Sequence, residues 1–122
     1  LAAYVGAHGV HWPARRLPAR LLRNRFPIQP ASAHDGSELV RAARAGVDAA
    51  IVSSVFPSSS PSAAKPMGAH RFLGIAQSSP LPVYALGGVT AQTAGRLASA
   101  RTNTIAGFAA VSSIHDAWKI RP

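Results

Sequence analysis

Short apolar runs alternate along this chain with stretches in which apolar residues recur at helical spacing. The strongest apolar runs lie within residues 48–56, 82–89 and 104–114, and weaker ones lie within 9–12 and 27–34. The strong runs are apolar throughout, which is typical of strands that are covered on both faces. The pattern therefore predicts five strands of a parallel sheet.

The segment of residues 35–47, DGSELVRAARAGV, carries the clearest helix signal. Asp35 or Ser37 can cap its first turn, and Gly46 can end it. Three apolar side chains of this helix are expected to face the core: Leu39, Val40 and Ala43.

Weaker signals predict helices within residues 17–26, 67–79 and 90–100, the last of them capped by Thr90. Residues 115–120 are expected to begin a final helical turn. Strand and helix therefore alternate along the chain. Such an order requires parallel strands joined by right-handed crossovers.

Two α/β architectures fit this order within a single domain of residues 1–122. One is an open, doubly wound sheet with five strands. The other is the C-terminal part, strands 4–8, of a (β/α)8 barrel of the TIM-barrel type. A complete barrel needs at least about 200 residues, so five strands cannot close one. The pattern by itself leaves both architectures open.

The charge balance narrows the class of ligand. Thirteen Lys and Arg residues oppose four Asp and Glu, which gives a formal charge of +9 at pH 7, and five arginines crowd residues 15–25. The excess favours anionic partners, although a solvated arginine-rich face also explains it. The chain has no reader motif, aromatic platform or zinc-finger spacing, so phosphorylated small molecules are expected as partners and nucleic acid is not.

The absence of cysteine excludes disulfides and thiolate metal sites. No apolar run approaches the roughly 20 residues that span a bilayer. The first ten residues, LAAYVGAHGV, lack the basic segment of a signal peptide. These features predict a cytoplasmic protein without a membrane partner.

Candidate ligand-binding residues lie where predicted strands end, because parallel α/β proteins bind ligands at the carboxyl ends of their strands. Gly87 and Gly88 follow one strand and precede the helix capped by Thr90. Glycine admits an anion close to the backbone, and a helix N-terminus offers free N–H groups. Val111 and Ser112 end the next strand. The two adjacent loops predict a phosphate site, unless the glycines only permit a tight turn.

His34 ends the strand predicted within residues 27–34, where an imidazole can act as a general acid or base or can be purely structural. The strand ends carry no pair of carboxylates, which argues against glycosidase chemistry. Residues 53–68, SSVFPSSSPSAAKPMG, have the composition of a flexible linker but follow a buried strand, where an active-site loop belongs. The remaining histidines lack the spacing of metal ligands: His8, His11, His70 and His115.

Four segments together resemble the thiamine-phosphate synthase/TenI family: GAHGVHW, ASAHDGSELVRAARAGVDAAIVSSVFPSSS, PVYALGGVT and FAAVSSI. The resemblance runs from about residue 6 to residue 114 and is closest to the divergent, short proteobacterial members. It implies a (β/α)8 barrel that joins hydroxymethylpyrimidine diphosphate to thiazole phosphate and releases pyrophosphate with help from Mg²⁺. The TenI branch instead tautomerises a thiazole carboxylate phosphate.

The resemblance also implies roles for single residues. Ser58 and Ser60 match two loop threonines that hold the phosphate and diphosphate groups, and Gly88, beside Gly87, matches the glycine whose N–H binds the thiazole phosphate. His34 matches the acid/base histidine of the tautomerases. Three further positions match backbone or pocket residues of the family: Val111 and Ser112 on the last strand and Ser32 in the pyrimidine pocket.

Two positions depart from the family pattern. GVHWPARR replaces GVHLGQED, so Arg16 stands where an aspartate binds Mg²⁺. An arginine cannot ligate Mg²⁺ but can pair with a diphosphate, so no cofactor is expected in this chain. Pro61 replaces a lysine, and Lys65 could reach in as its substitute.

Three functions follow from these matches. The first is a synthase-like transferase. The second is a TenI-like tautomerase in which His34 shuttles a proton without a metal. The third is a non-catalytic phosphate-binding remnant. A chain of five strands would also leave a sheet edge unpaired, which makes a homodimer an expected partner arrangement.

Overall fold

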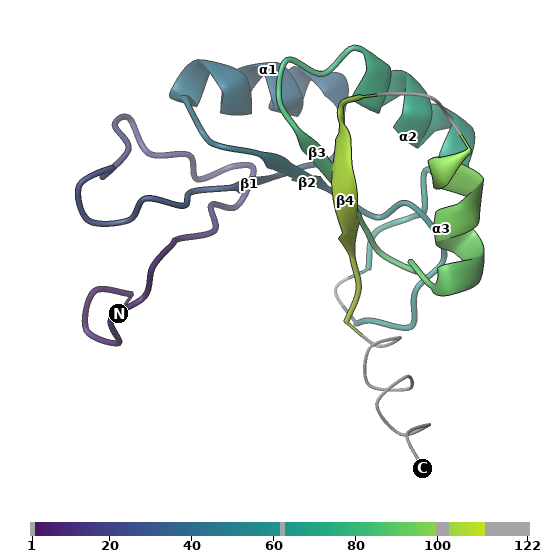
Figure 1. Cartoon of the computed structure of the whole chain (residues 1–122), viewed down its shortest axis with the longest axis horizontal. Coiled ribbons are helices and arrows are strands. Elements are labelled where there is room, and N and C mark those ends of the chain that lie inside the picture. The colour runs from purple at the N-terminus through teal and green to yellow at the C-terminus, as the bar shows by residue number, and fades with distance from the viewer. Residues whose placement is uncertain (1, 62, 100–102, 112–122) are drawn as a thin grey trace.

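The computed structural model describes residues 2–61, 63–99 and 103–111. Strands and helices alternate through this part of the chain (Figure 1). In chain order the elements are β1 (Ala31–Ala33), α1 (Gly36–Ala45), β2 (Ala50–Val52), α2 (Gly68–Gln77), β3 (Val83–Leu86), α3 (Ala91–Ala98) and β4 (Ile105–Ala109). The helical turn predicted from residue 115 lies outside the described residues.

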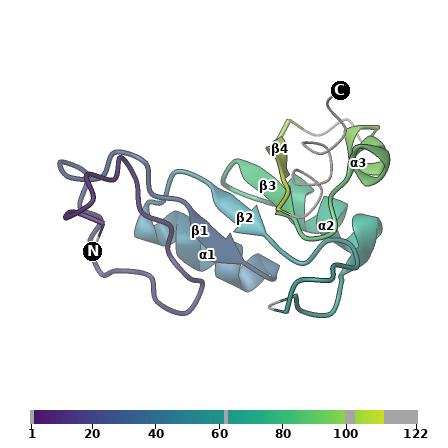
Figure 2. The same ribbon diagram turned by 90° about the horizontal axis from the view of Figure 1, so that it is seen from below.

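The strands form one parallel sheet in the order β1-β2-β3-β4, which confirms the predicted α/β fold. Each helix connects two neighbouring strands, as the crossover rule requires. The described helices lie along one side of the sheet (Figures 1 and 2). All four carboxyl ends therefore meet at one edge of the sheet.

Alternate strand residues form the core beneath the helices. Ala50 and Val52 of β2 and Val83 and Ala85 of β3 are completely buried. The helices contribute the large buried side chains of this core: Leu39, Phe72 and Leu97. Small residues on the strands allow these large helix residues to pack close to the sheet.

The strand residues that alternate with these core residues point to the other face of the sheet. Ser32, Ile51, Tyr84 and Gly107 lie in one register across the four strands. Tyr84 is 37% exposed, so the described elements leave its face of the sheet partly open. Among the described helices, none has the length and hydropathy needed to cross a bilayer.

The predicted ends of α1 are confirmed. The Asp35 carboxylate accepts a hydrogen bond of 2.8 Å from the N–H of Glu38, and Gly46 ends the helix with a φ of 80° in the left-handed region. Of the predicted core residues of α1, Leu39 is confirmed, whereas Val40 and Ala43 are wrong, because Ala42 is the other buried residue of this helix and Ala43 is only partly buried. Val40 is 41% exposed.

The two weaker strands are shorter than predicted. Residues 27–34 contribute only β1, and residues 9–12 contribute isolated parallel bridges from Gly9 to Ile28 and from Trp12 to Ala31. Pro27 and Pro30 lack the N–H group that a continuous ladder requires, which explains the interruption.

The helix predicted within residues 17–26 is wrong, because that segment is irregular and closes in a turn from Leu22 to Phe26. The Arg23 side chain instead forms an ion pair with Asp48 and donates to the carbonyl of Gly46. Phe26 is buried. Tertiary contacts with the end of α1 have therefore outweighed a weak helical pattern.

A buried polar network ties this segment to the sheet. Gln29 is completely buried, accepts a hydrogen bond from the Trp12 indole and donates one to the carbonyl of Phe26. Its backbone N–H donates to Asp48 at 2.6 Å. Partial burial pushes the pKa of Asp48 up, but the hydrogen bonds from Gln29 and Arg23 and the Arg23 charge outweigh it and lower that pKa.

We predict that Asp35→Ala lowers the free energy of unfolding by about 1 kcal/mol, because it removes the α1 cap, whereas Asp35→Asn retains most of the stability. Hydrogen bonds from the Glu38 backbone and the Ser37 hydroxyl lower the pKa of Asp35. The carboxylate therefore stabilises fully above its unfolded pKa of about 3.9 and loses this effect as the pH falls through the lower folded value. Urea unfolding at pH 7 measures the loss of stability in the variants, and urea unfolding at lower pH measures the pH dependence. An alanine variant as stable as the parent at pH 7 would contradict the prediction.

Candidate functional site

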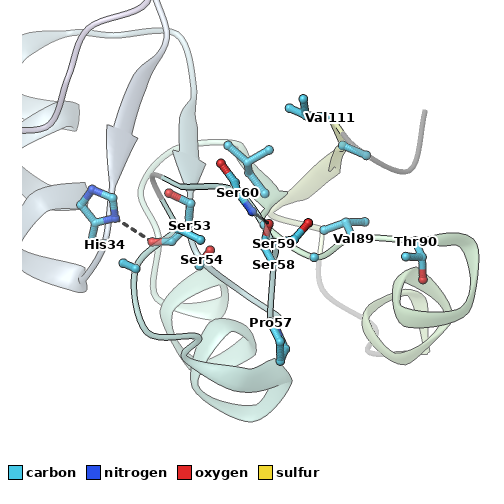
Figure 3. A pocket seen from close by; sticks show the side chains of 16 residues that line it. His34, Ser53, Ser54, Pro57, Ser58, Ser59, Ser60, Val89, Thr90 and Val111 are labelled. Carbon is cyan, nitrogen blue, oxygen red and sulfur yellow. Dashed lines mark hydrogen bonds between the residues drawn. The ribbon is translucent and has the colours of Figure 1, made fainter. Parts of the chain in front are cut away.

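A pocket of about 350 Å³ lies at the carboxyl ends of the strands (Figure 3). Its walls come from the end of β1, from the serine loop that we define as residues 53–67, and from the segments after β3 and β4. The side chains that Figure 3 labels in its lining are His34, Ser53, Ser54, Pro57, Ser58, Ser59, Ser60, Val89, Thr90 and Val111. The pocket therefore lies where the sequence predicted ligand binding.

The serine loop is anchored at both ends. At its start, the N–H groups of Val55 and Phe56 donate to the carbonyls of Leu86 and Gly87 at 3.0 and 2.9 Å. At its end, the N–H of Met67 donates to the carbonyl of Ser54 at 2.9 Å. Val55 and Phe56 are also buried in the core. The segment with the composition of a linker is therefore a closed loop fixed to the sheet.

The two glycines after β3 are required by their conformation and their surroundings. Gly87 and Gly88 have φ values of 94° and 61°, in the left-handed region. A Cβ atom on Gly87 would lie 2.4 Å from the Ser54 hydroxyl oxygen, and one on Gly88 would lie 2.1 Å from the Pro57 carbonyl oxygen. Both the turn and the approach of the serine loop therefore depend on glycine.

The turn leads directly into the N-terminus of α3. Thr90 caps this helix as predicted, and its hydroxyl accepts from the N–H of Thr93 while the Thr93 hydroxyl accepts from the N–H of Thr90. The Thr93 hydroxyl also lies 3.1 Å from the carbonyl of Gly88, to which it can donate. Thr90 lines the pocket, so the positive end of the helix dipole faces it.

His34 lies at the edge of the pocket beside the serine loop (Figure 3). Its ring Nδ1 is 2.6 Å from the carbonyl oxygen of Ser53. Its backbone N–H donates to the Glu38 carboxylate at 2.8 Å. The ring is thus held by the loop after β2 and the backbone of His34 by α1, and the predicted histidine is part of the pocket.

The structure brings together six of the residues predicted from sequence: His34, Ser58, Ser60, Gly87, Gly88 and Val111 all line the pocket. Ser112 lies outside the described residues. Arg16 and Lys65 are exposed and are not among the residues that line it.

Ser32 also lies outside the pocket lining and has a different partner. Its hydroxyl is 2.7 Å from Nε2 of His11, across the bridge between the first segment and β1. Burial lowers the pKa of His11 and thereby favours its neutral form. The sequence did not indicate this pair, because the two residues are far apart in the chain.

Four further polar residues line the pocket but were not singled out as ligand-binding: Ser53, Ser54, Ser59 and Thr90. Ser53 and Ser54 belong to the segment predicted as a strand, yet β2 already ends at Val52. The high serine content of residues 53–60 was the available signal. All five serines of this stretch line the pocket.

The donors in the pocket are neutral hydroxyls and backbone N–H groups, with one imidazole. Among the described residues no carboxylate lines it, and these residues contain no group of three or more side chains that could hold a metal ion. Mg²⁺ prefers oxygen ligands with one or two carboxylates. The described part of this chain therefore does not fit the Mg²⁺ site that the family resemblance implies.

We predict that Gly88→Ala destabilises the fold by about 1–3 kcal/mol, because the new side chain is strained at positive φ and meets the serine loop. Gly95→Ala is the matched control, since Gly95 lies within α3 with open space around it. The control is expected to be neutral or more stable by up to about 1 kcal/mol. Urea unfolding compares the two variants, and equal stability would contradict the prediction.

A sequence model described as thiamine monophosphate synthase matches residues 1–114. The thiamine-phosphate synthase of Salinispora arenicola is 34% identical over 120 residues, which cover 95% of this chain and 58% of the relative. The thiamine-phosphate synthase of Chloroflexus aurantiacus is 32% identical over 119 residues, which cover 95% of this chain and 55% of the relative. The chain spans about half the length of the curated relatives it matches.

The fold is similar to a solved structure as well. Thiamine phosphate pyrophosphorylase from Pyrococcus furiosus superposes with a TM-score of 0.68 at 28% identity, over 90% of this chain and 52% of that one. This likeness confirms the TIM-barrel type of the predicted α/β fold, of which the described residues form an open four-stranded sheet. By its sequence match and its structural likeness, the chain belongs to the thiamine monophosphate synthase family.

Proposed function

We propose that this protein acts in thiamine biosynthesis as a thiamine-phosphate synthase-like transferase, which joins hydroxymethylpyrimidine diphosphate to thiazole phosphate. The observation that carries the proposal is the pocket at the strand ends, where the serine loop, the paired glycines and the start of α3 converge. Membership of the family supplies the substrate class. Charged phosphorylated substrates stay inside the cell, so we place the activity in the cytoplasm.

The pocket suits a phosphate because it presents donors without a repelling carboxylate. The hydroxyls of Ser58 and Ser60 and the backbone around Gly88 can each donate to phosphate oxygens. The dipole of α3 favours negative charge at the same place. We propose that these groups hold the thiazole phosphate and the diphosphate in reach of each other.

In the transferase reaction, the bond between the pyrimidine methylene carbon and the diphosphate oxygen breaks, and pyrophosphate leaves with the electron pair. The thiazole nitrogen then uses its lone pair to form the new carbon–nitrogen bond. The protein contributes positioning and stabilisation of charge. Because the described residues do not fit Mg²⁺, no step is assigned to a metal.

A TenI-like tautomerase is the second candidate, and the placement of His34 favours it. The imidazole lies in the pocket lining with one ring nitrogen fixed by the Ser53 carbonyl. It can take a proton from one position of a thiazole carboxylate phosphate and return a proton to another. This reaction needs neither a diphosphate nor a metal, so it fits a pocket without carboxylates.

We predict that the protein binds thiazole phosphate and that Ser58→Ala and Ser60→Ala, made singly, each weaken this binding about tenfold to a hundredfold, since a hydrogen bond to a charged group is worth about 1.5–3 kcal/mol. Ser78→Ala is the control, because Ser78 ends α2 and bonds to its own helix. Calorimetry measures the affinities. Absence of binding by the parent protein would refute the proposed site.

The transferase is tested by release of pyrophosphate from the two precursors. The tautomerase is tested by conversion of the thiazole tautomer, which His34→Ala is expected to slow by about 10²–10⁴-fold, as loss of a general acid–base group does. Binding of thiazole phosphate should persist in that variant. Unchanged conversion by His34→Ala would refute the tautomerase, and binding with neither turnover would leave a non-catalytic phosphate-binding protein.

A further inference from the structure

Glu38 makes contacts that the cap of α1 does not need. Asp35 already caps the helix by accepting from the N–H of Glu38. In the usual capping box the third residue of the helix would reach back to the N–H of the cap residue. The Glu38 carboxylate instead accepts at 2.8 Å from the N–H of His34, one residue earlier.

The Glu38 side chain is well placed to hold His34. It is only 12% exposed, and its second oxygen lies 3.4 Å from Arg41 on the same helix. A charge-assisted hydrogen bond from a backbone N–H is stronger than a neutral one. The carboxylate therefore fixes the backbone of His34 at the junction between β1 and α1.

The ring of His34 is fixed from the opposite side. A carbonyl oxygen can only accept a hydrogen bond, so the Nδ1 atom, 2.6 Å from the carbonyl oxygen of Ser53, must carry the proton. In the neutral imidazole the other nitrogen, Nε2, then has the free lone pair. Among the described contacts, Nε2 has no partner.

We propose that Glu38 is a positioning residue, which together with the Ser53 carbonyl presents His34 as the Nδ1–H tautomer with Nε2 as the atom that exchanges protons with the ligand. The inference rests on the tautomerase function proposed above. It adds which nitrogen of His34 exchanges the proton, and it gives a positioning role to Glu38, which does not contact the reacting atoms.

The first readout is the tautomer itself, which does not depend on turnover. Nitrogen NMR of the protein labelled with ¹⁵N-histidine, in alkaline buffer where imidazoles are neutral, distinguishes Nδ1–H from Nε2–H, and His34→Gln assigns the signal. We expect the Nδ1–H form to dominate in the parent protein, which is the reverse of the preference of free histidine. A dominant Nε2–H form would overturn the proposal.

Variants of Glu38 test the positioning role. Glu38→Ala removes the acceptor of the His34 backbone N–H, so the ring should lose its fixed position against the Ser53 carbonyl and the Nδ1–H form should become the minor one. The kcat for tautomer conversion should then fall by up to about 100-fold with little change in KM. Glu38→Gln keeps an acceptor oxygen and should restore both. Arg41→Gln is the matched control, since it removes the ion pair with Glu38 and a hydrogen bond to Ser37 but leaves the contact between Glu38 and His34, and it should change neither.

Each outcome separates this inference from the proposed function. An Nδ1–H tautomer that persists in folded Glu38→Ala would refute the role of Glu38, whatever the activity. Tautomer shifts that occur as expected in a protein without turnover would support the positioning contact and refute the tautomerase. Circular dichroism shows whether each variant folds. If Glu38→Ala does not fold, Glu38→Gln becomes the test, and loss of the Nδ1–H form in that variant would contradict the proposal.

Discussion

The close approach of the serine loop to the two glycines after β3 is the contact on which the pocket depends. Backbone hydrogen bonds join Val55 and Phe56 to the end of β3 and its turn, and neither Gly87 nor Gly88 has room for a side chain beside them. Ser58 of this loop and Thr90 at the start of α3 line the same pocket. Without these contacts, the conformational entropy of a serine-rich loop would oppose a single conformation of this pocket wall.

A second set of contacts fixes the opposite wall. The segment before β1 has little regular structure, yet Asp48 joins Arg23 to the backbone of Gln29 and so ties that segment to the loop before β2. β1 then leads directly into His34, whose backbone and ring are held from two different elements. The imidazole therefore has a defined orientation although its side chain is solvent-exposed.

The distribution of charge gives the site its character. The chain is strongly basic, but within residues 2–61, 63–99 and 103–111 no Lys or Arg lines the pocket, and the donors there are hydroxyls, backbone N–H groups and one imidazole. These donors would recognise the phosphate of the proposed ligand by geometry and by the dipole of α3 more than by formal charge. The arginines near the N-terminus have a structural use in at least one case, since Arg23 pairs with Asp48.

Sequence patterns were sufficient to predict the parallel α/β order, both ends of α1, the Thr90 cap and the strand ends that carry the pocket, because these features depend on local patterns of apolar, capping and glycine residues. They misplaced the helix within residues 17–26, where contacts with Asp48 outweigh a weak local preference. The placement of Ser53 and Ser54 in the pocket and the fixing of Nδ1 of His34 emerge only from the three-dimensional arrangement. Both depend on contacts between segments distant in the chain, which no local pattern records.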